Sequence, residues 1–477
     1  MTLFTGINIL NIAILLIVSY TSYYYYKYFT RENPLPGPLP LPLIGNLFTI
    51  LRDVSIWPSE LQSKYGDIFE VYAGPSRKVW LCNEELAEKF LIPVIRSNFH
   101  NRINKNSDLR EIGIVNTGLA YNIDYESWAF IRKFYSKSIF SPPFLKQALI
   151  STQNSFQKME NYWRTLGEDA VQDFTQWAQN YVIDTVDIVT TSKSSNALAC
   201  YYKKISSDNT EVSDRILKES EHLSKCTRGY ATSILWYRSV PKIFRNFPGI
   251  HLFTKKLKEQ VNWLRTNAIN IVKNRREEIE RTPEDISLTR DLLTMFLTIN
   301  TTRDITKGIA DDINDRPLSD EEIAPVFMEI SLASFFSTSE VMGHIFHMIS
   351  KHPKVKKQLV KEFNDVFGED PDSQITYEGI NKLDYCDAVL KEALRTSPFL
   401  PFLAKTNEKP DQINGYEFPE NTDFYLNIQA FHKNKSKWKD PELFNPDRFM
   451  DKSHPDYKNQ LYIFGSGVRE EIWLNLY

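Results

Sequence analysis

Two pairs of side chains have residue types and a spacing that chemistry can use. Glu392 and Arg395 are three residues apart, so they face the same side of a helix and can form an ion pair. His344 and His347 are also three residues apart and could share a metal ion, but no acidic residue flanks them at HExxH spacing. Taken singly, the first pair is explained as a surface ion pair and the second as packing or surface histidines.

The elements that position these pairs are mostly helical. A long helix is predicted to begin near Ser319, which has capping-box spacing to Glu322, and to end at His352-Pro353. A second helix is predicted over residues 384–397, before Pro398, and residues 255–281 form a charged amphipathic helix. Alternating residues around Gly74-Pro75 predict a β-hairpin over 66–82, and a short second hairpin is predicted over 414–426.

The N-terminal segment has the composition of a membrane anchor. No charged side chain occurs from Thr2 to Tyr26, and about 25 helical residues exceed the roughly 30 Å hydrocarbon core of a bilayer. Tyrosines follow at the interface, with Lys27 and Arg31 just beyond, which predicts that the rest of the chain faces the cytosol. A cleaved signal peptide is the alternative, although the start lacks basic residues and a small-residue cleavage site. The proline-rich residues 34–42 predict an extended, semi-rigid spacer.

Composition excludes some classes of protein. Of the 477 residues, 42% are hydrophobic, which is enough for a sizeable core, and the net charge of -3 argues against nucleic acid as a partner. The four cysteines form no CxxC pair, so their spacing predicts neither a zinc site nor a disulfide framework. The expected state is reduced, mostly buried thiols.

Several motifs in order along the chain resemble the cytochrome P-450 (heme-thiolate monooxygenase) family, in its microsomal, membrane-anchored form. They are the Glu-x-x-Arg pair, Pro441-Glu-Leu-Phe-Asn-Pro-Asp-Arg-Phe449, Trp128-Ala-Phe-Ile-Arg132 and His432 before Trp438-Lys-Asp-Pro. The resemblance implies that Glu392, Arg395 and Arg448 form a buried structural triad below the heme. It also implies that Trp128 packs near the heme and that Arg132 neutralises a heme propionate.

The long helix carries a variant of the family's oxygen-activating motif. By resemblance, Ser337 falls on the threonine that bonds dioxygen and Thr338 follows it, so both are candidate catalytic residues. A serine hydroxyl can still relay protons. Phe336 occupies the acidic position and Ser334 replaces the glycine that lets the helix bulge, so proton delivery is predicted to need another route. On spacing alone, these residues are explained as the core face of a helix.

The C-terminal stretch matches only part of the family's heme-binding loop. Phe464, Gly467 and Arg469 match cofactor-binding positions, and Arg469 would be a second propionate partner. The cysteine expected two residues after Arg469 is replaced by Glu471, so no axial metal ligand is predicted. A thiolate favours O–O cleavage by donating electron density to the iron, and a carboxylate should not substitute for it. The family continues beyond this point with a helix and a hairpin, so the sequence predicts a degraded or truncated C-terminus.

The resemblance implies a mainly α fold with small β-sheets, preceded by one transmembrane helix. The expected organisation is an anchor over 1–29, a Pro-rich hinge over 30–46 and a heme domain over 47–477. The implied cofactor is heme b, and the implied partners are the membrane, a NADPH-cytochrome reductase and an apolar small-molecule substrate. The implied location is the endoplasmic reticulum membrane, single-pass, with the domain facing the cytosol. Two functions stay open: a monooxygenase that inserts one oxygen atom from O2, or a non-catalytic anchored member because of Glu471.

Overall fold

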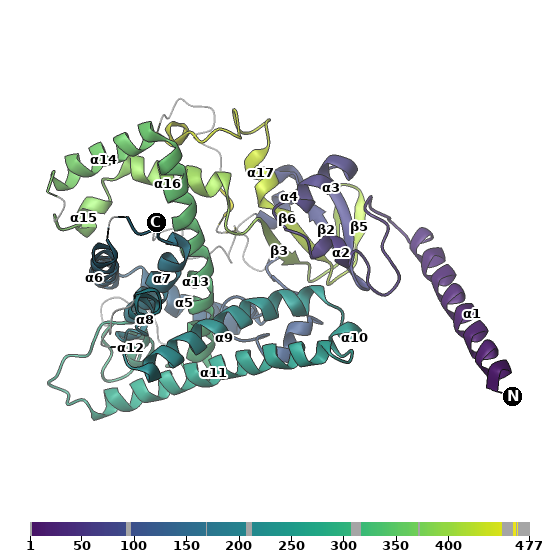
Figure 1. Cartoon of the computed structure of the whole chain (residues 1–477), viewed down its shortest axis with the longest axis horizontal. Coiled ribbons are helices and arrows are strands. Elements are labelled where there is room, and N and C mark those ends of the chain that lie inside the picture. The colour runs from purple at the N-terminus through teal and green to yellow at the C-terminus, as the bar shows by residue number, and fades with distance from the viewer. Residues whose placement is uncertain are drawn as a thin grey trace.

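The computed structural model is mainly helical with two small sheets, as the sequence predicted. It describes residues 2–91, 97–167, 169–206, 212–306, 316–370, 373–450, 461–463 and 465, with the backbone alone for residues 2–8. The sheets and their short helices form one side of the body, and the long helices form the other (Figure 1). α1 projects away from both.

α1 (Thr2–Phe29) is the predicted apolar helix. Its stretch Ile9–Phe29 has 21 residues with a mean hydropathy of 1.3, and none of the apolar window is buried by the rest of the chain. A helix of this length reaches across the hydrocarbon core of a bilayer. Length and composition therefore make α1 a candidate membrane span.

The Pro-rich segment after α1 is extended, and it lies against the first sheet. Leu35 is buried, and the Pro36 carbonyl accepts a hydrogen bond from the Glu70 amide at 2.9 Å. The buried Glu70 carboxylate also pairs with Arg31, just after α1, and with Arg77 at 2.6 Å. These contacts attach the end of the anchor directly to the sheet.

The first sheet has four strands in the order β1-β2-β6-β3. β1 (Ile68–Ala73) and β2 (Ser76–Leu81) form the hairpin predicted over 66–82. β6 (Asp423–Asn427) pairs in parallel with β2 and antiparallel with β3 (Phe402–Thr406). The sheet thus joins segments from both ends of the chain.

The prediction of a hairpin over residues 414–426 is wrong, because the two strands that pair lie earlier in the chain. The actual hairpin joins β4 (Asp411–Ile413) to β5 (Tyr416–Phe418) through Asn414-Gly415, both with positive φ, as an Asn-Gly turn favours. β6 is not part of this hairpin and lies between β2 and β3 in the first sheet. All five of its residues are buried, as expected for a strand in the interior of a sheet.

The remaining elements are short helices, several of them beside the sheets, and the longer helices of the other half of the body. The short N-terminal helices are α2 (Leu47–Ile50), α3 (Trp57–Tyr65), α4 (Glu84–Leu91) and η1 (Asp108–Ile112). The helical half contains α5 (Tyr125–Ile139), α6 (Pro142–Leu166), α7 (Phe174–Thr191), α8 (Ala197–Ile205), α9 (Asp214–Ser239), α10 (Lys242–Arg245), α11 (Ile250–Arg281), α12 (Leu292–Thr298), α13 (Asp320–Lys351), α14 (Pro353–Phe367), α15 (Tyr377–Ile380) and α16 (Asp384–Thr396). α17 (Ile428–Lys433) and η2 (Pro446–Phe449) follow the sheet strands.

α13 is the predicted long helix, and it runs through the middle of the helical half (Figure 1). Its 32 residues begin after Ser319, whose side chain and that of Glu322 form the predicted capping box. The N-terminal half packs into the largest apolar cluster, with α5, α9, α11 and α12. α13 therefore fixes the positions of the helices that surround the candidate site.

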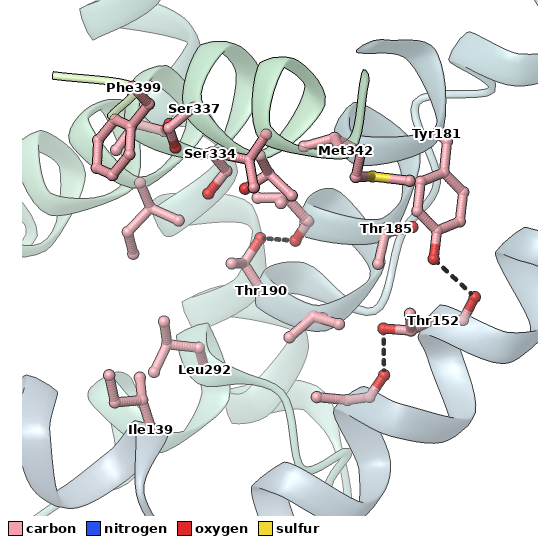
Figure 2. A pocket seen from close by; sticks show the side chains of 18 of the residues that line it. Ile139, Thr152, Tyr181, Thr185, Thr190, Leu292, Ser334, Ser337, Met342 and Phe399 are labelled. Carbon is pink, nitrogen blue, oxygen red and sulfur yellow. Dashed lines mark hydrogen bonds between the residues drawn. The ribbon is translucent and has the colours of Figure 1, made fainter. Parts of the chain in front are cut away.

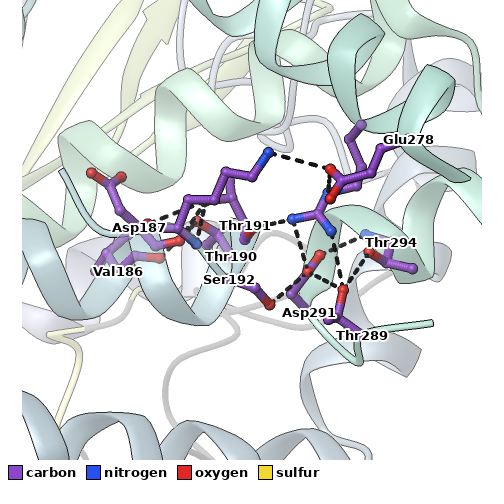
Figure 3. Close-up of polar contacts among 11 residues, drawn as sticks. Val186, Asp187, Thr190, Thr191, Ser192, Glu278, Thr289, Asp291 and Thr294 are labelled. Carbon is purple, nitrogen blue, oxygen red and sulfur yellow. Dashed lines mark hydrogen bonds and ion pairs between the residues drawn. The ribbon is translucent and has the colours of Figure 1, made fainter. Parts of the chain in front are cut away.

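A buried charge cluster joins α7, α11 and α12 (Figure 3). Arg275 on α11 donates to the Thr191 carbonyl at the end of α7 and lies 3.3 Å from the Asp291 carboxylate. Asp291 caps α12 by accepting from the Thr294 amide at 2.8 Å, and it also accepts from Ser192 at 2.7 Å. One carboxylate thus connects the ends of two helices to the side of a third.

Candidate functional site

The first candidate site is a cavity of about 370 Å³ beneath the middle of α13, here called the α13 cavity. Ser334, Ser337 and Thr338 form its α13 wall, and Figure 2 shows Ser334 and Ser337 facing across it toward Thr190 and Leu292. Tyr135, Ile139, Leu394 and Phe399 complete other walls from α5, α16 and the segment after α16. The cavity is mostly apolar, with hydroxyls on α13 and on the helices that face it.

The two predicted catalytic hydroxyls share this cavity, but one of them is already engaged. The Ser337 hydroxyl donates to the Ala333 carbonyl one turn earlier on α13, at 2.6 Å. Phe336, in the position where the family has an acid, contacts Phe335 with their ring centroids 4.6 Å apart. In this region α13 is a regular helix with an internally bonded serine, so its proton-relay role stays a prediction.

α5 contributes the predicted Trp128 and Arg132. Asp124 caps this helix by accepting from the Ser127 amide, which sets where the helix begins. Trp128 is buried, and the Arg132 guanidinium lies 6.0 Å from its ring centroid. Neither residue lines the α13 cavity, whereas Tyr135 and Ile139 further along α5 do. The pair therefore lies on the helix that forms one wall, beyond the cavity itself.

The structure brings Glu392, Arg395 and Arg448 together in one buried cluster. Arg395 Nε lies 2.8 Å from Glu392 Oε2, and Arg448 Nε donates to Glu392 Oε1 at 3.1 Å. The three side chains are at most 1% exposed. Both arginines also donate to the Leu443 carbonyl, so the cluster holds the loop before η2 against α16. Its predicted place below the heme stays a prediction.

His432 extends this cluster toward the end of the described chain. Its backbone carbonyl accepts from Arg395 at 3.0 Å, and its Nε2 accepts from the Tyr462 amide at 3.3 Å. Burial, together with the nearby Arg395 charge, lowers the pKa of His432 to about 3, so the ring is neutral. A neutral imidazole thus positions the segment that leads into residues 464–471.

The predicted heme-loop residues Phe464, Gly467, Arg469 and Glu471 lie outside the described residues. Gly465 is described, and its φ of +86 favours glycine. The predicted packing of His344 agrees with a contact between its Nε2 and the Thr396 hydroxyl at 3.2 Å. In the described parts of the chain, no group of three or more His, Cys, Asp or Glu side chains could hold a metal.

A second cavity of about 560 Å³, here called the sheet cavity, lies between the first sheet and the C-terminal end of α9. Its walls include Trp57, Trp80, Phe402 and Tyr425, and Leu400 lines it where Phe399 lines the α13 cavity. The two cavities therefore border the same segment after α16. The sequence pattern did not predict the sheet cavity, because the residues of its walls come from segments far apart along the chain.

Sequence reasoning also missed Glu329, one turn before Ala333 on α13. Its carboxylate accepts hydrogen bonds from the backbone amides of Leu119 and Ala120, at 2.6 and 3.1 Å. Gly118, with φ +62, leaves no room for a Cβ beside this carboxylate. Glu329 thus fixes the loop before α5 against α13, a contact that no local motif signals.

Comparison with known proteins identifies the family. The family model described as Cytochrome P450 matches residues 35–470. The chain belongs to the cytochrome P450 family. Cytochrome P450 3A14 of Cavia porcellus is 23% identical over 98% of this chain and 86% of its own length. Carnosic acid synthase of Rosmarinus officinalis is 24% identical over 91% of this chain and 81% of its own length.

A solved P450 structure shares the fold. Retinoic acid-bound cyanobacterial CYP120A1 superposes with a TM-score of 0.69 at 17% identity, covering 93% of this chain and 89% of that one. Membership of the P450 family assigns the chain to the heme monooxygenases by resemblance, with heme as the cofactor that family and fold imply. The microsomal relatives and the apolar α1 fit anchoring in the endoplasmic reticulum membrane.

The described residues fit heme in part. The α13 cavity is mostly apolar, which suits the ring of heme, but in the described chain no cysteine lines either cavity and no arginine or lysine lines the α13 cavity. Cys82 lies in the sheet core, where burial raises the pKa of its thiol to about 12, and burial raises that of Cys386 to about 11. A buried thiol with a raised pKa is mostly protonated at neutral pH and is unreactive. All four cysteines lie outside the linings of the two cavities, so none is placed where the P450 family needs its thiolate.

Proposed function

We propose that this P450 holds heme in the α13 cavity and acts on an apolar small molecule. The observation that carries the proposal is the convergence of Ser337, Thr338, Leu394 and Phe399 on one apolar cavity under α13. Bound heme would supply dioxygen activation for insertion of one oxygen atom into the substrate. The chain's own residues would exclude water from the cavity and present hydroxyls to it from α13 and from the helices that face α13.

Arg132, Arg469 and the triad are the proposed supports of the cofactor. Arg132 has a fixed position beside buried Trp128, and a guanidinium is suited to pair with a carboxylate such as a propionate. The Glu392 cluster holds the loop that leads toward residues 461–465 through His432. Heme binding is thus proposed to depend on residues far apart along the chain.

We also propose a single-pass topology with residues 47–477 as a cytosolic domain and residues 30–46 as the Pro-rich segment that joins this domain to α1. The charge pattern supports it, because Lys27 and Arg31 follow the apolar stretch immediately. Electrons would come from a membrane-bound NADPH-cytochrome reductase. Lys133, Lys435, Lys437 and Lys439 are exposed, and an acidic partner would recognise cations of this kind.

The proposed function is tested by reconstitution. The full chain in lipid nanodiscs is mixed with heme, reduced and exposed to carbon monoxide, and its Soret band is recorded. Stoichiometric heme binding is expected, and the position of the band reports the ligand beneath the iron. A thiolate-type band would refute the prediction made from Glu471. If no heme is retained, the monooxygenase proposal fails for this chain and the alternative, a non-catalytic anchored member, stands.

A further inference from the structure

The charged side chains that line the sheet cavity are all positive. Five cationic side chains line it, and no carboxylate or carboxamide does; the cations are Arg52, Lys78, Arg102, Arg238 and Lys405. Its other walls are aromatic and aliphatic, as in sites for small apolar ligands. An excess of positive charge in such a site favours a ligand that carries an anion on an apolar body.

Arg238 is the cation most available to such a ligand. Lys78 is paired with Asp423, and Arg52 with Glu60 at 2.8 Å. Among the described residues, Arg238 has no carboxylate within ion-pair distance, and its one hydrogen bond goes to the Tyr425 hydroxyl at 3.2 Å. A guanidinium has five N–H donors in a planar fork that matches a carboxylate. Most of the donors of Arg238 therefore have no acceptor in the part of the chain that the structure describes.

We propose that the sheet cavity binds an apolar carboxylic acid, with its carboxylate on the Arg238 guanidinium and its apolar body along Trp80 and Phe402. The apolar end would then point toward Leu400, which follows Phe399 of the α13 cavity directly in the sequence. This inference rests on the proposed function only in naming the class of substrate, because binding itself needs no heme.

The test measures binding without heme. The full chain in nanodiscs is titrated with dodecanoate and with dodecanol, and empty nanodiscs serve as the blank. Dodecanoate is expected to bind at least about tenfold more tightly, since a hydrogen-bonded charge contributes about that factor. Arg238→Met is expected to remove this preference while leaving dodecanol binding unchanged, and Arg238→Lys to keep part of it.

Arg228 provides a matched control, because it is an exposed arginine on the same helix that does not line the sheet cavity. Arg228→Met should leave dodecanoate binding unchanged, and thermal unfolding should show that each variant is folded. Equal affinity for dodecanol and dodecanoate would overturn the proposal. So would the absence of saturable binding, or an equal loss in Arg228→Met. None of these outcomes depends on whether the chain holds heme.

Discussion

The Arg448 guanidinium donates to the Glu392 carboxylate at 3.1 Å although 56 residues separate them along the chain. Arg395 binds the same carboxylate from one turn further along α16. The two arginines also bind the backbone carbonyls of His432 and Lys439, each at 3.0 Å. One carboxylate thus balances two buried positive charges and holds three segments of the C-terminal region together.

Replacement of Glu392 by glutamine should destabilise the domain by roughly 3–5 kcal/mol, because two buried guanidiniums lose the negative charge that they share. The measurement is the free energy of unfolding by chemical denaturation. Asp387→Asn on the same helix is the control, since its pair with Lys391 is 44–47% exposed and should contribute less than about 1 kcal/mol. Equal effects of the two substitutions would contradict a structural role for the triad.

Asp291 combines a helix cap with a buried ion pair, and two substitutions separate these roles. Asp291→Asn keeps an oxygen that can accept from the Thr294 amide, whereas Asp291→Ala loses both the cap and the charge. Alanine is expected to cost roughly 3–5 kcal/mol because Arg275 stays buried, with asparagine about 1 kcal/mol less severe. Denaturation curves of the two variants check this order. The reverse order would show that the cap contributes nothing.

His432 should make the domain sensitive to acid. Burial holds the pKa of His432 at about 3 in the folded chain, against 6.5 in its ordinary state. Below pH 6.5 the unfolded chain therefore binds a proton that the folded chain does not, so stability falls as the pH falls. Between pH 7 and pH 5 this group alone should cost about 2 kcal/mol.

The check is unfolding at both pH values for the parent chain and for His432→Gln. Glutamine can accept from the Tyr462 amide but cannot titrate, so the variant should lose about 2 kcal/mol of the difference in stability between the two pH values. The substitution can also change the stability of the variant at pH 7, but only the change in stability between the two pH values is compared. An identical pH dependence in both chains would refute the assignment.

Glu471 offers a direct test of ligation. In Glu471→Cys, the cysteine stands where the P450 loop pattern expects it, two residues after Arg469. Reduced, heme-loaded and exposed to carbon monoxide, this variant is expected to show a thiolate-type Soret band that the parent chain lacks. Glu471→Gln should behave as the parent. A thiolate-type band in the parent would instead mean that another cysteine reaches the iron.

Local signals account for what the sequence predicted well. α13 could be placed from Ser319, Glu322 and Pro353 because a capping box and a helix-ending proline act within one turn. The first hairpin was equally predictable from the residues around its turn. In these elements, neighbouring residues determine the outcome.

Long-range contacts account for what the sequence missed. β6 was assigned to a hairpin with its neighbours, yet its Asp423 pairs with Lys78, 345 residues earlier. Arg238 and Tyr425, which form part of the sheet cavity, are 187 residues apart. A local sequence pattern does not determine contacts between residues so far apart. For this reason, neither the sheet cavity nor the Glu329 contact with the loop before α5 could be predicted.

The attachment of Arg31 to Glu70 limits how the body can move relative to its anchor. α1 ends at Phe29, and Arg31 already contacts the sheet, so only Thr30 separates a bilayer-length helix from the folded body. A body attached this closely cannot swivel freely. It would keep one tilt toward the lipid and hold the α2 side of the sheet cavity, at Ile50 and Leu51, at a constant height above the headgroups.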